Sequence, residues 1–109
     1  MSTTTLVLQL TERHLSEGRP FKADHCPVAL CVNEMMLPEF SFVTARRKFY
    51  IFKAEDVDSP VCNSLYTGIN HLSVQEFVRA FDAGKVVYPQ KITVTVPTEY
   101  IRHDPTTEL

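Results

Sequence analysis

The sequence predicts an α+β fold, a two-layer sandwich of about four mostly antiparallel strands and three helices in the order β-α-α-β-β-α-β. Segments near both ends of the chain alternate apolar and polar residues, as half-buried strands do. Two internal segments repeat apolar residues with the period of an α-helix. With 109 residues, of which 44% are hydrophobic, the chain is long enough for one domain with its own core.

The first predicted strand covers residues 5–10. Leu6, Leu8 and Leu10 fall on one face of it, because successive side chains of a strand point to opposite sides. Thr11 follows and can accept a hydrogen bond from a free amide of the first helical turn. The sequence therefore predicts a short helix over residues 12–17, which Gly18 ends.

The second helix is expected over residues 27–36. Proline is favoured at the first helical position, and Asp24 or Cys26 just before Pro27 could accept bonds from the free amides. Apolar residues recur at helical spacing and predict the buried face: Val28, Cys31, Val32 and Met35.

A hairpin is predicted next. Residues 40–43 and 49–52 are rich in aromatic and β-branched side chains, and they flank a polar turn at residues 45–48. Residues 54–72 then show no sustained period and contain several turn-forming residues. We therefore expect a loop that is longer than compact domains usually carry, and loops of this length are often functional.

The third helix has the clearest signal. Ser73 and Glu76 have the spacing of a capping box, and Gly84 supplies the stop. The apolar positions of this helix are Val74, Phe77, Val78 and Phe81. With Val28 and Val32, Phe77 and Phe81 are expected to be buried against the sheet.

The last predicted strand mirrors the first. Ile92, Val94 and Val96 alternate with polar residues, and we expect the two terminal strands to pair. Pro97 ends this run. The sequence thus predicts a single domain over residues 1–97 and a polar, frayed tail over residues 98–109.

Charge and cysteine content limit the function classes. The formal charge is −2, which excludes a strongly basic nucleic-acid binder and makes nucleic acid an improbable partner. The number of cysteines, three, is odd, and the chain is large enough to fold without disulfide bonds. Both observations favour reduced thiols and a cytoplasmic location. Apolar stretches are far shorter than the roughly 20 residues that cross a bilayer, so no membrane association is expected.

Motifs for catalysis, cofactors and metals are missing from the sequence. It contains no phosphate-binding glycine loop, no G-x-S-x-G and no H-E-x-x-H. No C-x2-C or H-x3-H pair nucleates a zinc site, and Cys26 and Cys31 would point in different directions on one helix. We therefore expect a protein without catalytic activity, cofactor or metal.

The basic cluster at the hairpin turn is the first candidate site. Basic residues beside aromatic residues suit phosphates and bases, although a solvated turn explains the same pattern. With the long loop, the turn forms the predicted contact surface, for which the candidate residues are Arg46, Arg47, Lys48, Tyr50, Asp56, Asp58 and Tyr66.

Two alternatives involve the start of the second helix. Free amides there could bind a nucleotide or another small anion, together with Arg19, Lys22, His25 and Cys26. Cys26 could also act as the nucleophile of a thiol enzyme, because a helix N-terminus and a neighbouring imidazole favour the thiolate. The same residues are also explained without a function if Cys26 is a buried cap at the start of the helix and the His25 side chain points into solvent.

Several motifs resemble a set of small bacteriophage proteins of unassigned role. They are Thr11-x-x-His14-Leu15-x-x-Gly18, Asp24-x-Cys26-Pro27-Val28-Ala29-Leu30 and Phe77-x-x-x-Phe81-Asp82-x-Gly84, followed by a strand after Pro89. The similar proteins have a T-x-x-H-I-x-x-G turn and a C-P-[VI]-A-[LI] helix, so Leu15 departs from the usual isoleucine. The resemblance implies an accessory protein that binds a host protein in the host cytoplasm, for example as an inhibitor of a defence system or an enzyme. An edge strand could also pair two copies into a homodimer.

Overall fold

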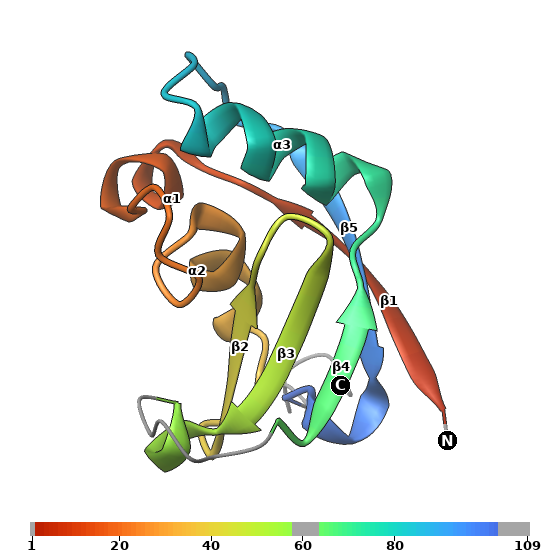
Figure 1. Ribbon diagram of the computed structural model, residues 1–109. Coiled ribbons are helices and arrows are strands. Elements are labelled where there is room, and N and C mark those ends of the chain that lie inside the picture. Colours follow the sequence, from red (N-terminus) through yellow and green to blue (C-terminus); the bar gives the residue numbers. More distant parts are fainter. Residues whose placement is uncertain (1, 58–63, 103–109) are drawn as a thin grey trace.

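The computed structural model describes residues 2–57 and 64–102, and it has the α+β class that the sequence predicts (Figure 1). The helices are α1 (Glu12–Glu17), α2 (Pro27–Asn33) and α3 (Leu72–Asp82). The strands are β1 (Thr3–Gln9), β2 (Phe40–Thr44), β3 (Lys48–Lys53), β4 (Tyr66–Ile69) and β5 (Lys91–Pro97). Short 3₁₀ turns occupy Ala54–Asp56 and Thr98–Tyr100.

The strands form two antiparallel sheets rather than the single four-stranded sheet that we expected. β1 pairs with β5, which confirms the predicted pairing of the terminal strands, and β2, β3 and β4 form the second sheet. The strand that the sequence does not predict is β4, which lies inside the segment 54–72, where we expected a loop. It has only four residues and includes Gly68, so its alternation is too short to recognise in the sequence.

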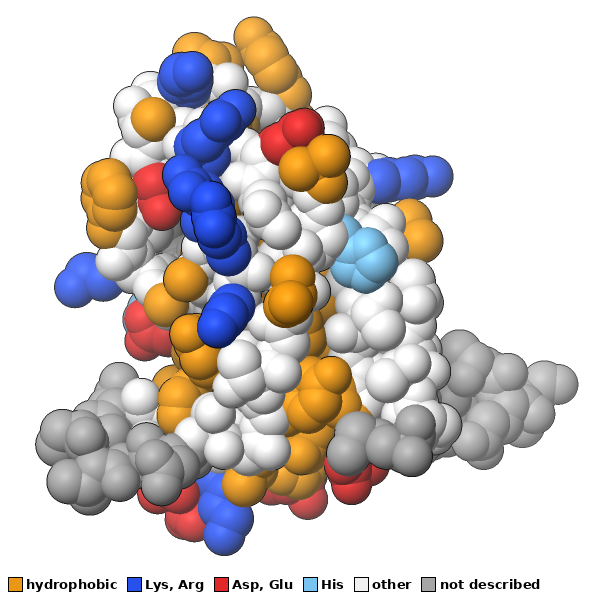
Figure 2. Space-filling model, turned by 45° about the vertical axis from the view of Figure 1, so that its right-hand side comes forward, with side chains coloured by type: hydrophobic (Ala, Val, Ile, Leu, Met, Phe, Trp, Pro, Cys, Tyr) orange, Lys and Arg blue, Asp and Glu red, His pale blue; other side chains and the backbone are white. Residues whose placement is uncertain are grey.

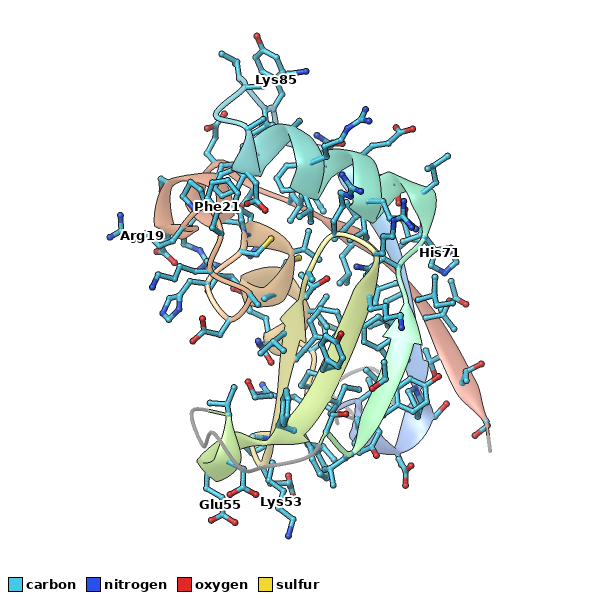
Figure 3. All side chains as sticks on the ribbon, in the orientation of Figure 1. Arg19, Phe21, Lys53, Glu55, His71 and Lys85 are labelled. Carbon is cyan, nitrogen blue, oxygen red and sulfur yellow. The ribbon has the colours of Figure 1, made fainter. Side chains whose placement is uncertain are left out.

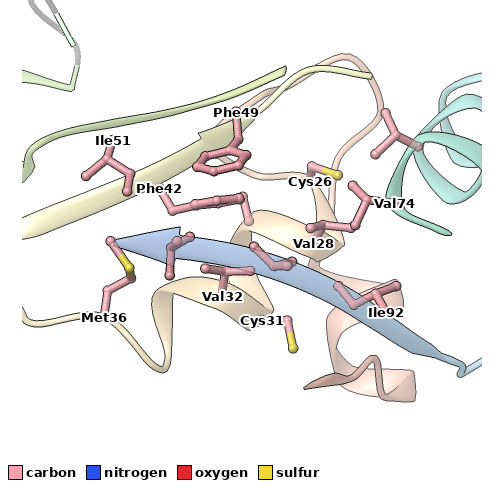
Figure 4. Packing of buried hydrophobic residues seen from close by; sticks show 14 of the residues in the cluster. Cys26, Val28, Cys31, Val32, Met36, Phe42, Phe49, Ile51, Val74 and Ile92 are labelled. Atoms are coloured by element: carbon pink, nitrogen blue, oxygen red, sulfur yellow. The ribbon is translucent and has the colours of Figure 1, made fainter. Parts of the chain in front are cut away.

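The core lies between the two sheets and is closed by α2 and α3 (Figure 4). The rings of Phe42 and Phe49 stack with their centroids 4.9 Å apart. Gly68 of β4 lies against the Phe49 ring, where an added Cβ would come within 2.3 Å of the ring. Four helix residues were expected to be buried. Val28, Val32 and Phe77 are buried, whereas Phe81 is half-buried and its ring stacks on that of Phe77.

Helix α1 has the predicted bounds and a cap that the sequence shows only in part. The Thr11 hydroxyl accepts a bond from the backbone amide of His14, and the His14 ring accepts one from the backbone amide of Thr11. Together these bonds form a capping box with histidine in the usual place of glutamate. Gly18 ends the helix directly against Pro27, the first residue of α2.

Helix α2 ends at Asn33, three residues earlier than predicted. The chain turns there because the Asn33 side chain binds the backbone of Phe42 in β2, with Oδ1 accepting at 2.7 Å and Nδ2 donating at 2.9 Å. As a result Met36 is buried and Met35, which we expected on the buried face, is 37% exposed.

The predicted capping box of α3 is wrong. His71 is the N-cap residue and makes no side-chain cap, whereas Ser73 lies within the helix, where its hydroxyl accepts a bond from the amide of Thr93 in β5. Gly84 does adopt a left-handed conformation with φ +75° after the helix, as its position predicts.

The folded part of the chain extends past residue 97, where the sequence analysis placed the start of a frayed tail. Tyr100 and Ile101 are buried, and Ile101 forms a β-bridge with Met36. The amide of Leu37 donates to the carbonyl of Tyr100, and the Tyr100 ring packs edge-on against Phe40. The two apolar residues in a polar sequence thus fix residues 98–102 to the domain, and residues 103–109 lie outside the described part.

We predict that Gly18→Ala lowers the free energy of unfolding by about 1–3 kcal/mol in urea denaturation. The added Cβ would lie 2.5 Å from Cγ of Pro27 and 3.0 Å from its nitrogen, so α1 and α2 would have to separate. Arg19→Ala changes an exposed neighbour and serves as the control. Equal stability of the two variants would contradict a close Gly18–Pro27 contact.

Candidate functional site

The turn between β2 and β3 is held in place by Asn70, a residue distant from it in the sequence. The side-chain amide of Asn70 donates to the Thr44 hydroxyl (2.8 Å) and to the carbonyls of Ala45 (2.9 Å) and Arg46 (3.2 Å). Its backbone amide donates to the carbonyl of Arg47 at 2.8 Å. Asn70 is buried, so its bond to Thr44 is shielded from water, and together these bonds fix the conformation of the turn.

Three arginine side chains gather where this turn meets α3. Arg46 and Arg47 come from the turn and Arg79 from the helix, and together with Leu72, Gln75 and Glu76 they line a shallow hollow of about 220 Å³. We call Arg46, Arg47 and Arg79 the basic ridge. Figure 2 shows Lys and Arg side chains in a nearly continuous run over this face, next to apolar and acidic groups.

The guanidinium groups of the basic ridge are available for binding. Within residues 2–57 and 64–102, none of them lies within 4 Å of a carboxylate. Arg13 differs from them, because it forms ion pairs with Glu17 and Glu34. Exposed arginines without an ion pair are well suited to a partner's carboxylate or phosphate groups, which they bind in a two-pronged geometry.

Phe21 adds an exposed aromatic ring beside the ridge. Its side chain is 79% exposed, and its backbone has a φ of 59°, a left-handed conformation that is strained for a bulky residue. The Asp82 carboxylate holds this conformation by accepting a bond from the Phe21 amide at 3.0 Å. Phe21, Arg46, Arg79 and Asp82 line a second hollow, so the ring adjoins two ridge arginines.

The other described residues of the predicted contact surface do not join this site. Lys48 is exposed at the start of β3, and Tyr50 lies on the outer side of the sheet near Phe52. Tyr66 points to the inner side, where its ring lies 5.9 Å from that of Phe49. Asp58 lies outside the described residues.

Asp56 lies at the opposite end of β3 from the turn, in the 3₁₀ turn Ala54–Asp56. Figure 3 shows Lys53 and Glu55 at this far end. The structure therefore does not place the turn and the start of the 54–72 segment on one surface, because the length of a strand separates them.

The alternative anion pocket is only partly assembled. Arg19, Lys22 and His25 line an open hollow together with Asp24, whose carboxylate contacts the His25 ring at 3.1 Å and opposes the entry of an anion. Cys26 is not among its lining residues and is only 3% exposed. Pro27 has no amide hydrogen to offer at the first helical position.

Burial also opposes a nucleophilic role for Cys26. Desolvation raises the pKa of its thiol to about 11, which outweighs the bonds from the helix backbone that lower it. Burial likewise raises the pKa of Cys31 to about 11. Both groups are therefore thiols at neutral pH, whereas nucleophilic chemistry needs an accessible thiolate.

Residues of the first two motifs quoted in the sequence analysis hold α1 against α2. The His14 ring is buried, with Nδ1 accepting from the Thr11 amide at 3.0 Å, so Nε2 carries the proton and donates to Glu34 at 3.1 Å. Arg13 binds the other oxygen of Glu34. These contacts, with the Gly18–Pro27 contact, explain the motifs as parts of the scaffold.

The sequence does not identify Phe21, Asn70, Gln75 or Arg79 as residues of the site. Asn70 lies in the segment 54–72, for which the sequence predicts a loop. One feature of the sequence could have indicated an exposed ring at Phe21: it is a large apolar residue between a proline and a lysine, in a segment without periodicity. The other three acquire a role only when α3 packs beside the turn, which no local pattern records.

No known protein family, curated protein or solved structure matches the chain. Within the described residues, none of the helices has the length and apolar character required to span a membrane.

We predict that Cys26 in the folded protein reacts with iodoacetamide at pH 8 about two orders of magnitude more slowly than in urea. The reason is the pKa of about 11, compared with 9.0 for a free thiol, together with burial. Mass spectrometry of the peptide that contains Cys26 gives the rate, and Cys31 is an internal control of similar pKa. Rapid and selective labelling of Cys26 would restore the thiol-enzyme hypothesis.

We further predict an acid-sensitive contribution from Glu34. Desolvation would raise the pKa of this carboxyl, but hydrogen bonds from Arg13 and His14 outweigh it and lower the pKa below 4.5. Because folding lowers this pKa, the unfolded state binds more protons, and the stabilisation present above pH 4.5 is lost as the pH falls through the folded-state pKa. Urea denaturation of Glu34→Gln between pH 7 and pH 3 should show a weaker pH dependence than wild type. The exposed Glu55→Gln is the control, and equal pH profiles of wild type and Glu34→Gln would contradict the ion pair.

Proposed function

We propose that the protein is a non-enzymatic binding protein that docks on an acidic surface of a partner protein. The observation that carries this proposal is the basic ridge, in which three arginines from two elements converge without an ion pair in the described part of the chain. Arginine and exposed aromatic side chains are enriched in protein interfaces, and they supply much of the binding energy there.

The surroundings of the ridge favour a protein over a nucleic acid. Glu76 lines the same hollow as the three arginines, and Asp82 lines the neighbouring one, so a run of phosphates would meet carboxylates. Leu72 is 68% exposed beside the ridge, and such aliphatic side chains fit the apolar core of a protein interface better than a sugar-phosphate backbone. Phe21 is the one exposed ring that adjoins the ridge within the described residues, whereas single strands are usually bound by several stacking rings.

The resemblance to small phage proteins gives this binding activity a biological setting. We propose that the partner is a host protein and that binding occurs in the host cytoplasm, where it inhibits a defence system or an enzyme. The scaffold role of these motif residues is compatible with this view, because Thr11, His14, Gly18 and Pro27 hold α1 and α2 together and are not part of the exposed ridge.

We predict that Arg46→Glu/Arg47→Glu/Arg79→Glu reduces capture of protein partners at least tenfold while the fold is retained, because all three side chains are exposed. Capture is measured from a lysate of cells in which the chain is naturally produced, at low and high salt. The triple variant Arg19→Glu/Lys53→Glu/Lys85→Glu makes the same change in charge at exposed positions outside the ridge.

Two results would contradict the proposal. One is equal capture by the ridge variant and the control variant. The other is tight, ridge-dependent binding of a single-stranded oligonucleotide in fluorescence anisotropy without capture of a protein, which would assign the ridge to nucleic acid.

A further inference from the structure

Two outer strand edges of this protein, those of β2 and β5, are met by specific contacts. The edge of β2 is covered because Asn33 binds both backbone groups of Phe42, and because the amides of Phe40 and Thr44 donate to the carbonyls of Leu37 and Ala23. On β5, the edge away from β1 is met by the Ser73 hydroxyl. The outer edge of β4 has only four residues. A covered edge and a very short edge strand both disfavour pairing with other chains.

The outer edge of β1 lacks this protection. The carbonyl of Ser2 accepts from Thr98 and the amide of Leu10 donates to Gln90, so the even-numbered residues of β1 bond to β5. The amides and carbonyls of Thr3, Thr5 and Val7 therefore point outward, and they meet no hydrogen-bond partner in the part of the chain that the structure describes. At Gln9 the carbonyl is already met by the Cys31 thiol at 3.7 Å, which sets the limit of the open edge.

The chemistry of β1 fits a second copy of itself. The strand has no charged residue, no proline and no bulge in its pairing, so it lacks the usual devices that repel another strand. Val7 is 64% exposed on one face, and Leu6 and Leu8 are only half-buried on the other. A copy placed alongside would cover both kinds of apolar side chain.

We propose that two copies of the chain associate through antiparallel pairing of their β1 strands about a two-fold axis at Thr5. Thr5 then faces the partner's Thr5, and Thr3 faces the partner's Val7. Each of the three residue pairs exchanges two backbone hydrogen bonds. The two-stranded β1–β5 ribbon becomes part of a four-stranded sheet, which exceeds the three strands that sheets generally need to be stable in water.

Thr5→Lys tests this pairing, because it places two like charges directly opposite each other at the two-fold axis. The control is Thr5→Val, which loses the same hydroxyl contact with Thr95 but adds no charge. Sedimentation equilibrium of wild type and Thr5→Val up to about 1 mM should show the mass rising from 12.4 kDa towards twice that value, because interfaces of this small size are weak. Thr5→Lys should stay at 12.4 kDa, with at least a tenfold weaker association.

Amide hydrogen exchange of the wild-type protein gives an independent readout. The amides of Thr3, Thr5 and Val7 should become protected as the concentration rises, whereas those of the even-numbered residues are already protected by β5. A wild-type protein that stays monomeric at 1 mM would overturn the proposal. A dimer that Thr5→Lys leaves unchanged would also overturn the proposal, and so would a dimer in which the amides of Thr3, Thr5 and Val7 stay unprotected. Either result would mean that the dimer uses another surface. The ridge variants change none of these residues, so this test is independent of the proposed function.

Discussion

The stack of Phe42 and Phe49 between the two sheets is the contact on which the rest of the fold depends. A ribbon of two strands and a sheet of three short strands each expose one apolar face, and a two-stranded ribbon by itself is at best marginally stable in water. The two rings fill the space between them and bring α2 and α3 to the same core. β4 can join only because Gly68 leaves room for the Phe49 ring.

Side-chain amides provide the second organising principle of the structure. Asn33 ends α2 and closes the edge of β2 by binding both backbone groups of Phe42. Asn70 fixes the hairpin turn to the start of α3. In each case an amide satisfies backbone groups that a continuous sheet or a tight Asn-Gly turn would otherwise satisfy. The Asn70 contact also sets the position of Arg46 and Arg47 relative to Arg79, so a polar core residue determines the geometry of the basic ridge.

Elements with a complete local pattern could be predicted from the sequence. The alternating terminal strands, the hairpin and the amphipathic helix around Phe77 have residue spacings that allow one structure, and they are present. The errors arise where a contact distant in sequence decides the result. α2 ends at Asn33 because β2 lies beside it, and residues 98–102 are ordered because Ile101 pairs with Met36. At the site, Arg46 and Arg47 were recognisable as a basic pair, but Arg79 joins them only through the packing of α3.

The basic ridge and the open β1 edge lie on separate elements, and this separation has a consequence for binding. Arg46, Arg47 and Arg79 are not residues of β1, so the proposed dimer would present two ridges. A partner with two acidic sites then binds the second ridge at a high effective concentration, without any new contact. By linkage, such a partner also strengthens the dimer, because it binds two paired copies more tightly than two separate ones. Under this proposal, the short edge of Thr3, Thr5 and Val7, weak in isolation, would be strengthened by a multivalent binding partner.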